Sequence, residues 1–445
     1  MMGNSCQRAE SVCHRAQLSV VILVTFLVQF VLLRPCSGPN PFVGRKQTSK
    51  LPERGLDERP LVSCGGHMAD ACSQCTDHNA NDDRDMCMGE CSWDAQASEC
   101  TEDSSVSHLL LSRQARKDLL QRYPFQPVLD QKGRFVNIVL VKSAFVGDED
   151  KAAFQRYRNE TLFLGIMSYE TFPLPSSNED SVLHYPPDEY TELFPGWLNM
   201  YRSPGSIFPS RVKTILMSQS DFGLPTIDYQ REVDEARHRK RFDFVYVMSG
   251  GGSALNENCT GWGPYTKNWT FAQQALEVMC GELNLNGAIL ASRRGDTSTW
   301  DSPPCDIPAS CRGKVLQTPF LWHGDAFDYI RQSKFLFVPQ VYDASPRVIA
   351  QALTFNVPIL VNAHIIGGWK YVNNMTGEFF HDLSDLRTSY GKLKKRLGVY
   401  QPRQYATSTY GDNICGRQFK SFVEENFPDY AALPEDTTHL IPTMM

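Results

Sequence analysis

Short apolar runs alternate with segments of helical period along most of this sequence, and that alternation constrains the fold more than any other feature. The run at 134–145 is continuous and β-branched, as expected for a strand that is covered on both faces. The run at 334–341 is followed by a helical segment and then by a further run at 357–362. Strands and helices that are joined by short turns indicate parallel βαβ units, so we predict an α/β fold.

Two series of such units occur, and they occupy residues 131–240 and 241–430. The chain of 445 residues is too long for one core, because single cores stop growing at roughly 250 to 300 residues. We therefore expect two doubly wound, Rossmann-like domains that face each other. The net charge of -6 is atypical of a protein that binds nucleic acid, so we expect no such partner.

Residues 18–33 form one apolar run. Its length lies between that of a spanning helix, about 17 to 25 residues, and that of the apolar region of a signal peptide, about 7 to 15 residues. We predict a signal anchor at 18–33 behind a cytosolic tail at 1–17, with cleavage near Gly38 as the alternative. Arg8 and Arg15 precede the run, which places the remainder of the chain in the lumen. The expected location is the Golgi or endoplasmic reticulum membrane, or secretion if the segment is cleaved.

A polar stem at 34–63 and a cysteine-rich module at 64–100 follow the run, and a linker helix is expected within 101–130. In a lumenal chain such cysteine density indicates a small module held by disulfides. The C-x-x-C and C-x-x-x-C spacings within the module also fit a zinc site, and the pairing cannot be read from the sequence. The cysteines expected in disulfides are Cys64, Cys72, Cys75, Cys87, Cys91 and Cys100. Residues 431–445 are expected to form a tail.

Four N-x-Ser/Thr sequons fit a lumenal location, because glycosylation of this kind occurs in the secretory pathway. The candidate glycosylation sites are Asn159, Asn258, Asn268 and Asn374. Some matches of this kind occur by chance, so each remains a candidate.

The sequence Ser345-Pro346-Arg347 lies between two apolar runs and predicts the start of a helix. Serine is a good N-cap, and proline is well placed at the first helical position, so the helix is expected to begin at Pro346. Arg347 and Gln351 are four residues apart and share its outward face. A helix N-terminus with an arginine favours a diphosphate ligand. The alternative is that Arg347 is a surface charge or pairs with Asp343.

The stretch also resembles a known motif. From about 242 to 427 the sequence is similar to the nucleotide-sugar-binding domain of GT-B glycosyltransferases, in particular the retaining group whose motif is acidic-x7-acidic. Asp343 stands at the first acidic position and Gln351, in place of the usual glutamate, at the second. The sequence QALTFNVPIL matches the helix and strand that follow, and Gly367-Gly368 with a later Thr-Gly match the tail. The S-x-R element is also similar to exostosin-like transferases.

The resemblance implies roles for single residues. It places the predicted catalytic residue Asp343 near the donor sugar, Arg347 near the diphosphate and Gln351 near the ribose. Lys267 corresponds by position to a lysine that contacts the donor phosphates, and Ser345 belongs to the same predicted substrate-binding set. Gly367 and Gly368 are expected to let the backbone approach the ligand.

The acceptor is expected in the first domain, where an aromatic segment at 181–204 contains His184. His184 is the candidate general base, because the unperturbed pKa of histidine allows that work. The alternative is that Trp197 and the tyrosines of this segment are ordinary core residues.

These features predict a membrane-anchored lumenal glycosyltransferase that moves a sugar from a nucleotide diphosphate donor to a glycan or glycoprotein. No cofactor beyond the donor and no metal are expected. One alternative is a metal-dependent transferase of another fold, in which Asp148-Glu149-Asp150 would hold the ion. A non-catalytic glycan-binding or adhesion protein on a degenerate GT-B scaffold is the other, and Gln351 is the feature that favours it.

Overall fold

The computed structural model describes residues 62–63, 68–69, 91–94, 99–102, 107–120, 122–168, 171–175, 189–225, 240–248, 255, 258–295, 299–430 and 432–443. The chain divides into two compact units, Met1–Glu58 and Arg59–Met445, and every described residue belongs to the second. The predicted cytosolic tail and anchor lie outside the described residues. Among those that are described, no helix is both long and apolar enough to span a membrane.

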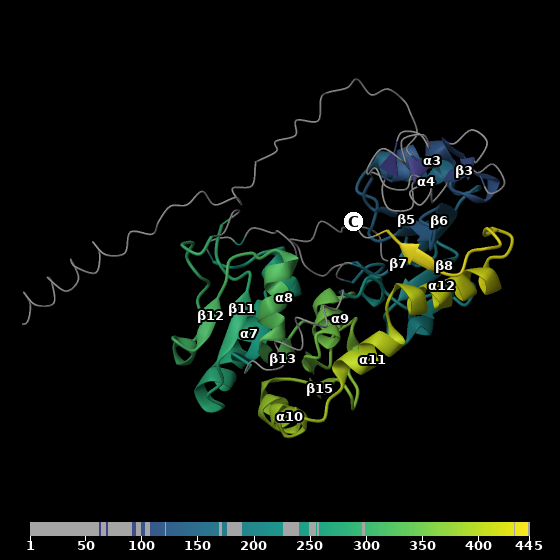
Figure 1. Cartoon of the computed structure of the whole chain (residues 1–445). Coiled ribbons are helices and arrows are strands. Elements are labelled where there is room, and N and C mark those ends of the chain that lie inside the picture. Colours follow the sequence, from purple (N-terminus) through teal and green to yellow (C-terminus); the bar gives the residue numbers. More distant parts are fainter. Residues whose placement is uncertain are drawn as a thin grey trace, which may run out of the picture. The chain divides into compact units, whose positions relative to one another are not determined.

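The second half of the chain builds a sheet of six parallel strands in the order β12-β11-β10-β13-β14-β15, drawn in green in Figure 1. The strands are β10 (Phe242–Val247), β11 (Gly287–Leu290), β12 (Val315–Gln317), β13 (Ser333–Val338), β14 (Ile359–Asn362) and β15 (Gly377–Phe380). After β10 the chain adds β11 and then β12 on one side of it. It then returns to place β13 on the other side of β10 and adds β14 and β15 beyond β13. This is the strand order of a Rossmann fold, with its switch point between β10 and β13. The predicted doubly wound domain is confirmed.

Helices cover both faces of this sheet because alternate side chains along each strand point to opposite faces. Phe244 and Tyr246 pack with α7 (Trp269–Leu276) and α10 (Leu383–Arg396). Val245, between them, belongs to the cluster of α8 (His323–Arg331) and α9 (Arg347–Thr354). We call this sheet with its helices the C-terminal lobe.

Two disulfides that the sequence did not reveal cross-link this lobe. Cys259 is bonded to Cys305, and Cys280 is bonded to Cys311. Cys280 lies in a π-helical turn, Glu277–Glu282, that continues α7. Cys311 ends the 3-10 turn Ala309–Cys311 before β12. The bridge from Cys280 to Cys311 therefore attaches the connection before β12 to the end of α7, and the other bridge joins two irregular segments to each other.

The first half of the body builds a second sheet, in the order β16-β5-β6-β7-β8-β9. The strands are β5 (Phe125–Asp130), β6 (Phe135–Val141), β7 (Leu162–Ile166), β8 (Gly196–Asn199), β9 (Lys213–Leu216) and β16 (Leu440–Pro442). Strands β6 to β9 are parallel, as predicted, but β5 and β16 are antiparallel additions. We call this sheet and its helices the N-terminal lobe.

The structure bears on two expectations about the edges of this lobe. The helix expected within 101–130 is present as the short α3 (Arg113–Leu119), and β5 begins soon after it at Phe125. The segment 431–445 is not a free tail, because β16 pairs with β5 from Leu440↔Asp130 to Pro442↔Val128. Arg134 donates to both Asp130 and Asp436, which fixes the approach to β16. The hydrogen bonds from Arg134 and Lys132 hold the pKa of Asp436 at about 2.

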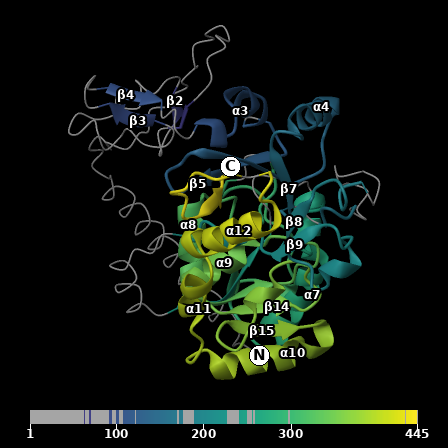
Figure 2. The ribbon, with the colours of Figure 1, turned by 90° about the vertical axis from the view of Figure 1, so that its right-hand side faces the viewer.

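The chain returns to the N-terminal lobe through α12 (Asp412–Asn426), which Figure 2 shows beside β5 and the C-terminal end. Phe419 of α12 packs edge-on against Phe222, with ring centroids 6.4 Å apart. A Cβ at Gly416 would lie 2.8 Å from the carbonyl oxygen of Leu440, so α12 and β16 are in close contact. Part of the predicted second domain thus contributes to the first lobe.

The cysteine-rich module and its flanking residues contribute two short antiparallel pairs to the described residues. They are β1 (Val62–Ser63) with β2 (Met68–Ala69), and β3 (Cys91–Asp94) with β4 (Glu99–Glu102). Cys91 is buried and disulfide-bonded, as expected. Cys64, Cys72, Cys75, Cys87 and the side chain of Cys100 lie outside the description.

Replacing both Cys280 and Cys311 by alanine should lower the free energy of unfolding by about 3 to 4 kcal/mol, because the bridge closes a span of 31 residues. Urea denaturation of the two proteins measures the difference. Cys415→Ala is the control, since Cys415 is a buried free cysteine and its loss should cost only about 1 kcal/mol. Equal losses in the two variants would show that the cross-link contributes nothing.

Candidate functional site

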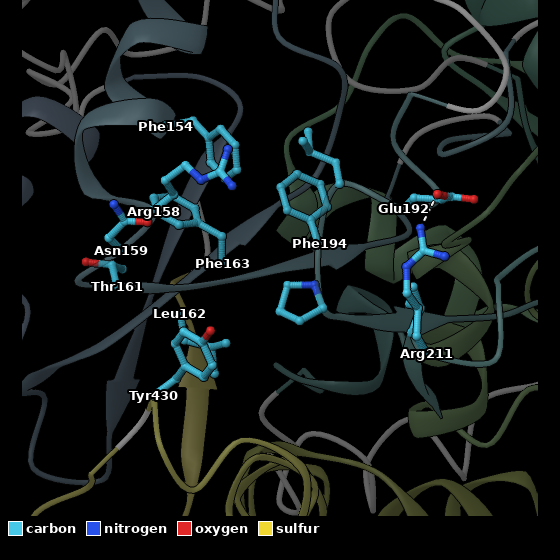
Figure 3. Close-up of a pocket in the computed structure, with 13 residues that line it drawn as sticks. Phe154, Arg158, Asn159, Thr161, Leu162, Phe163, Glu192, Phe194, Arg211 and Tyr430 are labelled. Carbon is cyan, nitrogen blue, oxygen red and sulfur yellow. Dashed lines mark hydrogen bonds and ion pairs between the residues drawn. The ribbon is translucent and has the colours of Figure 1, made fainter.

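Two cavities of about 430 Å³ occur among the described residues. One lies at the amino ends of β7, β8 and β9, where Phe154, Phe163 and Phe194 line it and the ion pair of Arg211 with Glu192 closes one side (Figure 3). Ligands of parallel sheets bind at the carboxyl ends of the strands. This first cavity is therefore at the opposite edge from the one where a ligand is expected.

The other cavity lies at the switch point of the C-terminal sheet, and we call it the switch-point cavity. Val247 at the end of β10 and Leu290 at the end of β11 form its floor, and Ser168 contributes to it from the N-terminal lobe. Five residues that the sequence predicted for the site line it together. They are Lys267, Asp343, Ser345, Arg347 and Gln351.

Lys267 and Asp343 form an ion pair in this cavity. The Nζ atom of Lys267 lies 2.5 Å from Oδ2 of Asp343, and their side chains are 15% and 10% exposed. The other carboxylate oxygen of Asp343 accepts a hydrogen bond from the backbone N–H of Ser345 at 3.3 Å. The carboxylate that the resemblance places near the donor sugar is thus fixed from two sides.

The helix α9 presents its polar face to the cavity, as predicted. Arg347 is exposed and Gln351 is half-buried, whereas Ile349 and Leu353 are fully buried against the sheet. The predicted start of the helix was wrong by one residue, because α9 begins at Arg347 with Pro346 as its N-cap.

Ser345 does not cap α9, and its hydroxyl is used elsewhere. Its Oγ atom lies 2.6 Å from Oγ of Ser220 and accepts a hydrogen bond from the backbone N–H of Ser220 at 3.1 Å. It also donates to Oγ of Ser218 at 3.3 Å. Both partners belong to the N-terminal lobe, so Ser345 connects the two lobes at the edge of the cavity.

Gly367 and Gly368 allow a close approach, but to protein rather than to the cavity. A Cβ at Gly367 would lie 1.9 Å from the carbonyl oxygen of Ala344. Gly368 has a φ of +79°, and a Cβ there would lie 2.5 Å from the ring of Pro346. The expectation that these glycines approach a ligand is corrected, since they pack the loop after β14 against the loop that carries Asp343.

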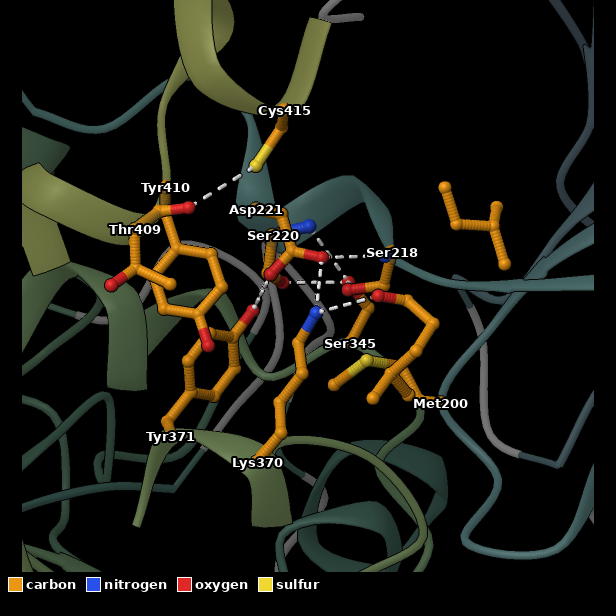
Figure 4. Close-up of polar contacts among 12 residues, drawn as sticks. Met200, Ser218, Ser220, Asp221, Ser345, Lys370, Tyr371, Thr409, Tyr410 and Cys415 are labelled. Carbon is orange, nitrogen blue, oxygen red and sulfur yellow. Dashed lines mark hydrogen bonds and ion pairs between the residues drawn. The ribbon is translucent and has the colours of Figure 1, made fainter. Parts of the chain in front are cut away.

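A buried polar network extends this contact into the N-terminal lobe (Figure 4). Lys370 donates to Oδ2 of Asp221 at 2.6 Å, and the hydroxyl of Tyr371 donates to Oδ1 at 2.7 Å. The backbone N–H of Ser218 also donates to Oδ2 of Asp221, and that of Gly411 donates to its carbonyl oxygen. Burial raises the pKa of Tyr371 well above its usual value, which keeps the hydroxyl a donor.

Sequence reasoning missed Asp221 and Lys370. Their side chains are 0% and 10% exposed, yet they are 149 residues apart in the chain. The segments around them carry no motif that relates one to the other.

Of the residues discussed for the acceptor, the structure describes several aromatic ones but not His184. His184 lies outside the described residues, so its role stays a prediction. Trp197 in β8 is fully buried, and its ring would lie 2.3 Å from a Cβ at Gly165. Tyr190 and Tyr201 are also buried, so these three residues belong to the core.

The sequons differ in their surroundings. Asn159, Asn258 and Asn374 are exposed. Asn268 is half-buried with a φ of +55°, and its Nδ2 atom, to which a glycan would be attached, donates to the carbonyl oxygen of Pro339 at 2.9 Å. The fold therefore uses the atom that glycosylation would modify, and this disfavours Asn268 as a site.

The acidic run that suggested a metal site forms the first turn of α4 (Asp148–Tyr157). Glu149 accepts a hydrogen bond from Arg122 at 2.9 Å, and Asp150 accepts one from the backbone N–H of Val146. Acidic residues are stabilising at this end of a helix. Across the described ranges, no group of three or more His, Cys, Asp or Glu residues is arranged to hold a metal ion.

The sequence matches no protein-family model and no curated protein sequence. Sucrose-phosphate synthase from Thermosynechococcus elongatus superposes with a TM-score of 0.40 and 11% identity, over 65% of this chain and 74% of that one. A pneumococcal O-GlcNAc transferase, GtfA, in complex with UDP and GlcNAc gives 0.42 and 11%, over 66% and 57%. The lipopolysaccharide outer core galactosyltransferase WaaB in its apo form gives 0.40 and 11%, over 66% and 75%. These superpositions are loose. The C-terminal sheet is assigned as a Rossmann fold from its own strand order, and the N-terminal sheet shares with it a run of parallel strands, β6 to β9.

Replacing Asp221 by asparagine should lower the free energy of unfolding by about 3 to 5 kcal/mol, because it leaves the buried ammonium of Lys370 without its counter-charge. Chemical denaturation measures the change. Glu424→Gln is the matched control, since it breaks an exposed helical pair with Lys420 and should change stability by less than about 0.5 kcal/mol. A similar small change for Asp221→Asn would mean that the network does not stabilise the fold.

Proposed function

We propose that this protein is a GT-B glycosyltransferase that transfers a sugar from a nucleotide diphosphate donor to a glycan or glycoprotein. The observation that carries the proposal is the switch-point cavity, in which Arg347 begins a helix at the carboxyl edge of a parallel sheet. Helix N-termini and arginine both favour phosphate groups, and the switch point is where nucleotides bind in such sheets. The relation to exostosin-like transferases stays a prediction.

The cavity offers different chemistry along its length. Arg347 and the positive N-terminal end of α9 suit the diphosphate, and Gln351, one turn further on, suits the ribose hydroxyls. Phe320 and Phe327 line another part and offer apolar surface for the base. The pair of Lys267 and Asp343 occupies the remaining polar wall, where the resemblance places the donor sugar.

In the proposed reaction, the bond between the sugar C1 and the diphosphate oxygen breaks, and an acceptor hydroxyl oxygen forms a new bond to C1. The diphosphate leaves with the bonding electron pair. Arg347 and the helix N-terminus stabilise its negative charge, and the enzyme acts mainly by holding donor and acceptor in position. The acceptor hydroxyl loses a proton in this step, and His184 is the proposed base.

We place the protein in the secretory pathway, with an N-terminal anchor in the Golgi or endoplasmic reticulum membrane. Two disulfides in the C-terminal lobe and a third at Cys91 support an oxidising compartment. Exposed sequons at Asn159, Asn258 and Asn374 fit the same location.

Arg347→Ala should weaken binding of the donor nucleotide roughly 10- to 100-fold, because a hydrogen-bonded charge is lost. The measurement is the thermal stabilisation of the full-length protein by UDP, GDP and CMP and by their sugar conjugates, since a ligand that binds only the folded state raises its stability. Arg417→Ala, an exposed arginine of α12 that does not line this cavity, is the control. Unchanged affinity in Arg347→Ala would remove the site, and stabilisation by no nucleotide would favour a glycan-binding protein instead.

We further propose that transfer needs no metal ion, because Arg347 and the N-terminus of α9 supply positive charge at the cavity. Nucleotide binding and sugar transfer should therefore persist in excess EDTA at unchanged rate. Restoration of a lost activity by added Mn²⁺ would contradict this proposal and would favour the metal-dependent class.

A further inference from the structure

The cavity shown in Figure 3 has no role in the proposed function, because it lies at the amino ends of β7, β8 and β9. We call it the amino-edge cavity. Part of its wall is apolar, since Phe154, Phe163 and Phe194 line it and are at most 4% exposed. Its volume of about 430 Å³ falls within the roughly 300 to 1,000 Å³ that is typical of small-molecule sites. The cavity is therefore large enough to hold a sugar residue.

The remaining wall of this cavity is polar, and it includes a candidate glycosylation site. Asn159 lines the cavity beside Thr161, the third residue of the same N-x-Thr sequon (Figure 3). Arg158, Arg211 and Glu192 also line it and are exposed. A cavity with an apolar wall and a polar rim matches a sugar ring, which carries C–H groups on its faces and hydroxyls at its edge.

The local fold presents Asn159 on a turn between α4 and β7. The backbone N–H groups of Glu160 and Thr161 both donate to the carbonyl oxygen of Tyr157, at 3.0 and 2.9 Å. The side chain of Asn137 donates to the carbonyl oxygen of Glu160 at 2.5 Å. Asn159 itself is exposed, and within the described segments its side-chain amide takes part in no hydrogen bond. The fold thus fixes the turn without using the atom to which a glycan would be attached.

Asn159 differs in this respect from the other three sequons. Asn268 uses its Nδ2 atom within the fold. Asn258 and Asn374 are exposed, but neither of them lines the amino-edge cavity or the switch-point cavity. Asn159 is therefore the sequon at which an attached sugar would have one of these cavities beside it.

We propose that Asn159 is glycosylated and that the first N-acetylglucosamine of its glycan binds in the amino-edge cavity, where Tyr430 packs against it. Tyr430 lines the cavity with 56% of its surface exposed. Covering this ring and the apolar wall removes apolar surface from water, so the glycan stabilises the N-terminal lobe. A tethered sugar also has a high effective concentration at the cavity. The inference rests on the lumenal location in the proposed function and is independent of nucleotide binding.

The first test measures whether the glycan is present and covered. Mass spectrometry of the full-length protein, produced in eukaryotic secretory cells, gives the occupancy of each sequon, and we expect Asn159 to be occupied. An amidase that removes whole N-glycans should release the Asn159 glycan more slowly from the native protein than from the denatured one. The glycan at Asn374 is the control, and its release should depend less on denaturation because no cavity of this kind lies beside it.

The second test measures the stability that the sugar contributes. Asn159→Gln keeps an amide but removes the sequon, and it should lower Tm by about 2 to 4 °C, whereas the matched control Asn374→Gln should leave Tm unchanged. Trimming the wild-type glycans to the first N-acetylglucosamine with an endoglycosidase should also leave Tm unchanged. Tyr430→Ala should lower Tm in the glycosylated protein and have no further effect in Asn159→Gln, because both changes remove one contact.

Three results would overturn the inference. They are an unmodified Asn159 in a protein that carries a glycan at another sequon, release of the Asn159 glycan at the same rate from native and denatured protein, and additive effects of Asn159→Gln and Tyr430→Ala. A protein with no glycan at any sequon would contradict the lumenal location, and this inference with it. Binding of nucleotides, measured separately, would still test the proposed transferase activity.

Discussion

The buried ion pair of Asp221 with Lys370 is the contact on which the arrangement of the two lobes depends. Two charges taken out of water lose several kcal/mol of hydration each, and their attraction offsets that loss only if the remaining polar atoms are also satisfied. Here Tyr371 and the backbone N–H of Ser218 occupy the other positions on the carboxylate. A pair of this kind tolerates little displacement, so it fixes one relative position of the N-terminal and C-terminal lobes.

That position reaches the switch-point cavity through a short chain of contacts. Lys370 comes two residues after Gly368, whose missing side chain leaves room for the ring of Pro346, and Pro346 is the residue before Arg347. On the other side of the same loop, Ser345 contacts Ser220, the neighbour of Asp221. The first turn of α9 is therefore held from both lobes. Arg347, which would contact the diphosphate, is therefore positioned by residues that do not contact that ligand.

Most of the fold could be predicted from local sequence pattern, because the strands and helices of βαβ units differ in the spacing of their apolar residues. The apolar face of α9 and the strands β10 and β13 could be predicted from residues that are neighbours in the chain. Strands β5 and β16 could not, because β16 has only three residues and its partner is about 300 residues away. The prediction of Ser345 as the N-cap of α9 was wrong for the same reason. Ser345 has the chemistry of an N-cap, but a hydroxyl 125 residues away in the chain is its partner instead.

The glycine pair shows how a motif can point to the right place for the wrong reason. Gly367 and Gly368 were expected at the ligand because the resemblance includes them, and a glycine permits close approach to whatever lies opposite. What lies opposite is the backbone of Ala344 and the ring of Pro346. The same two glycines can therefore belong to a binding motif without contacting the ligand, because they set the loop from Asp343 to Arg347 against the sheet. A motif read from sequence identifies the residues that a site requires, and only the packing separates those that bind from those that position.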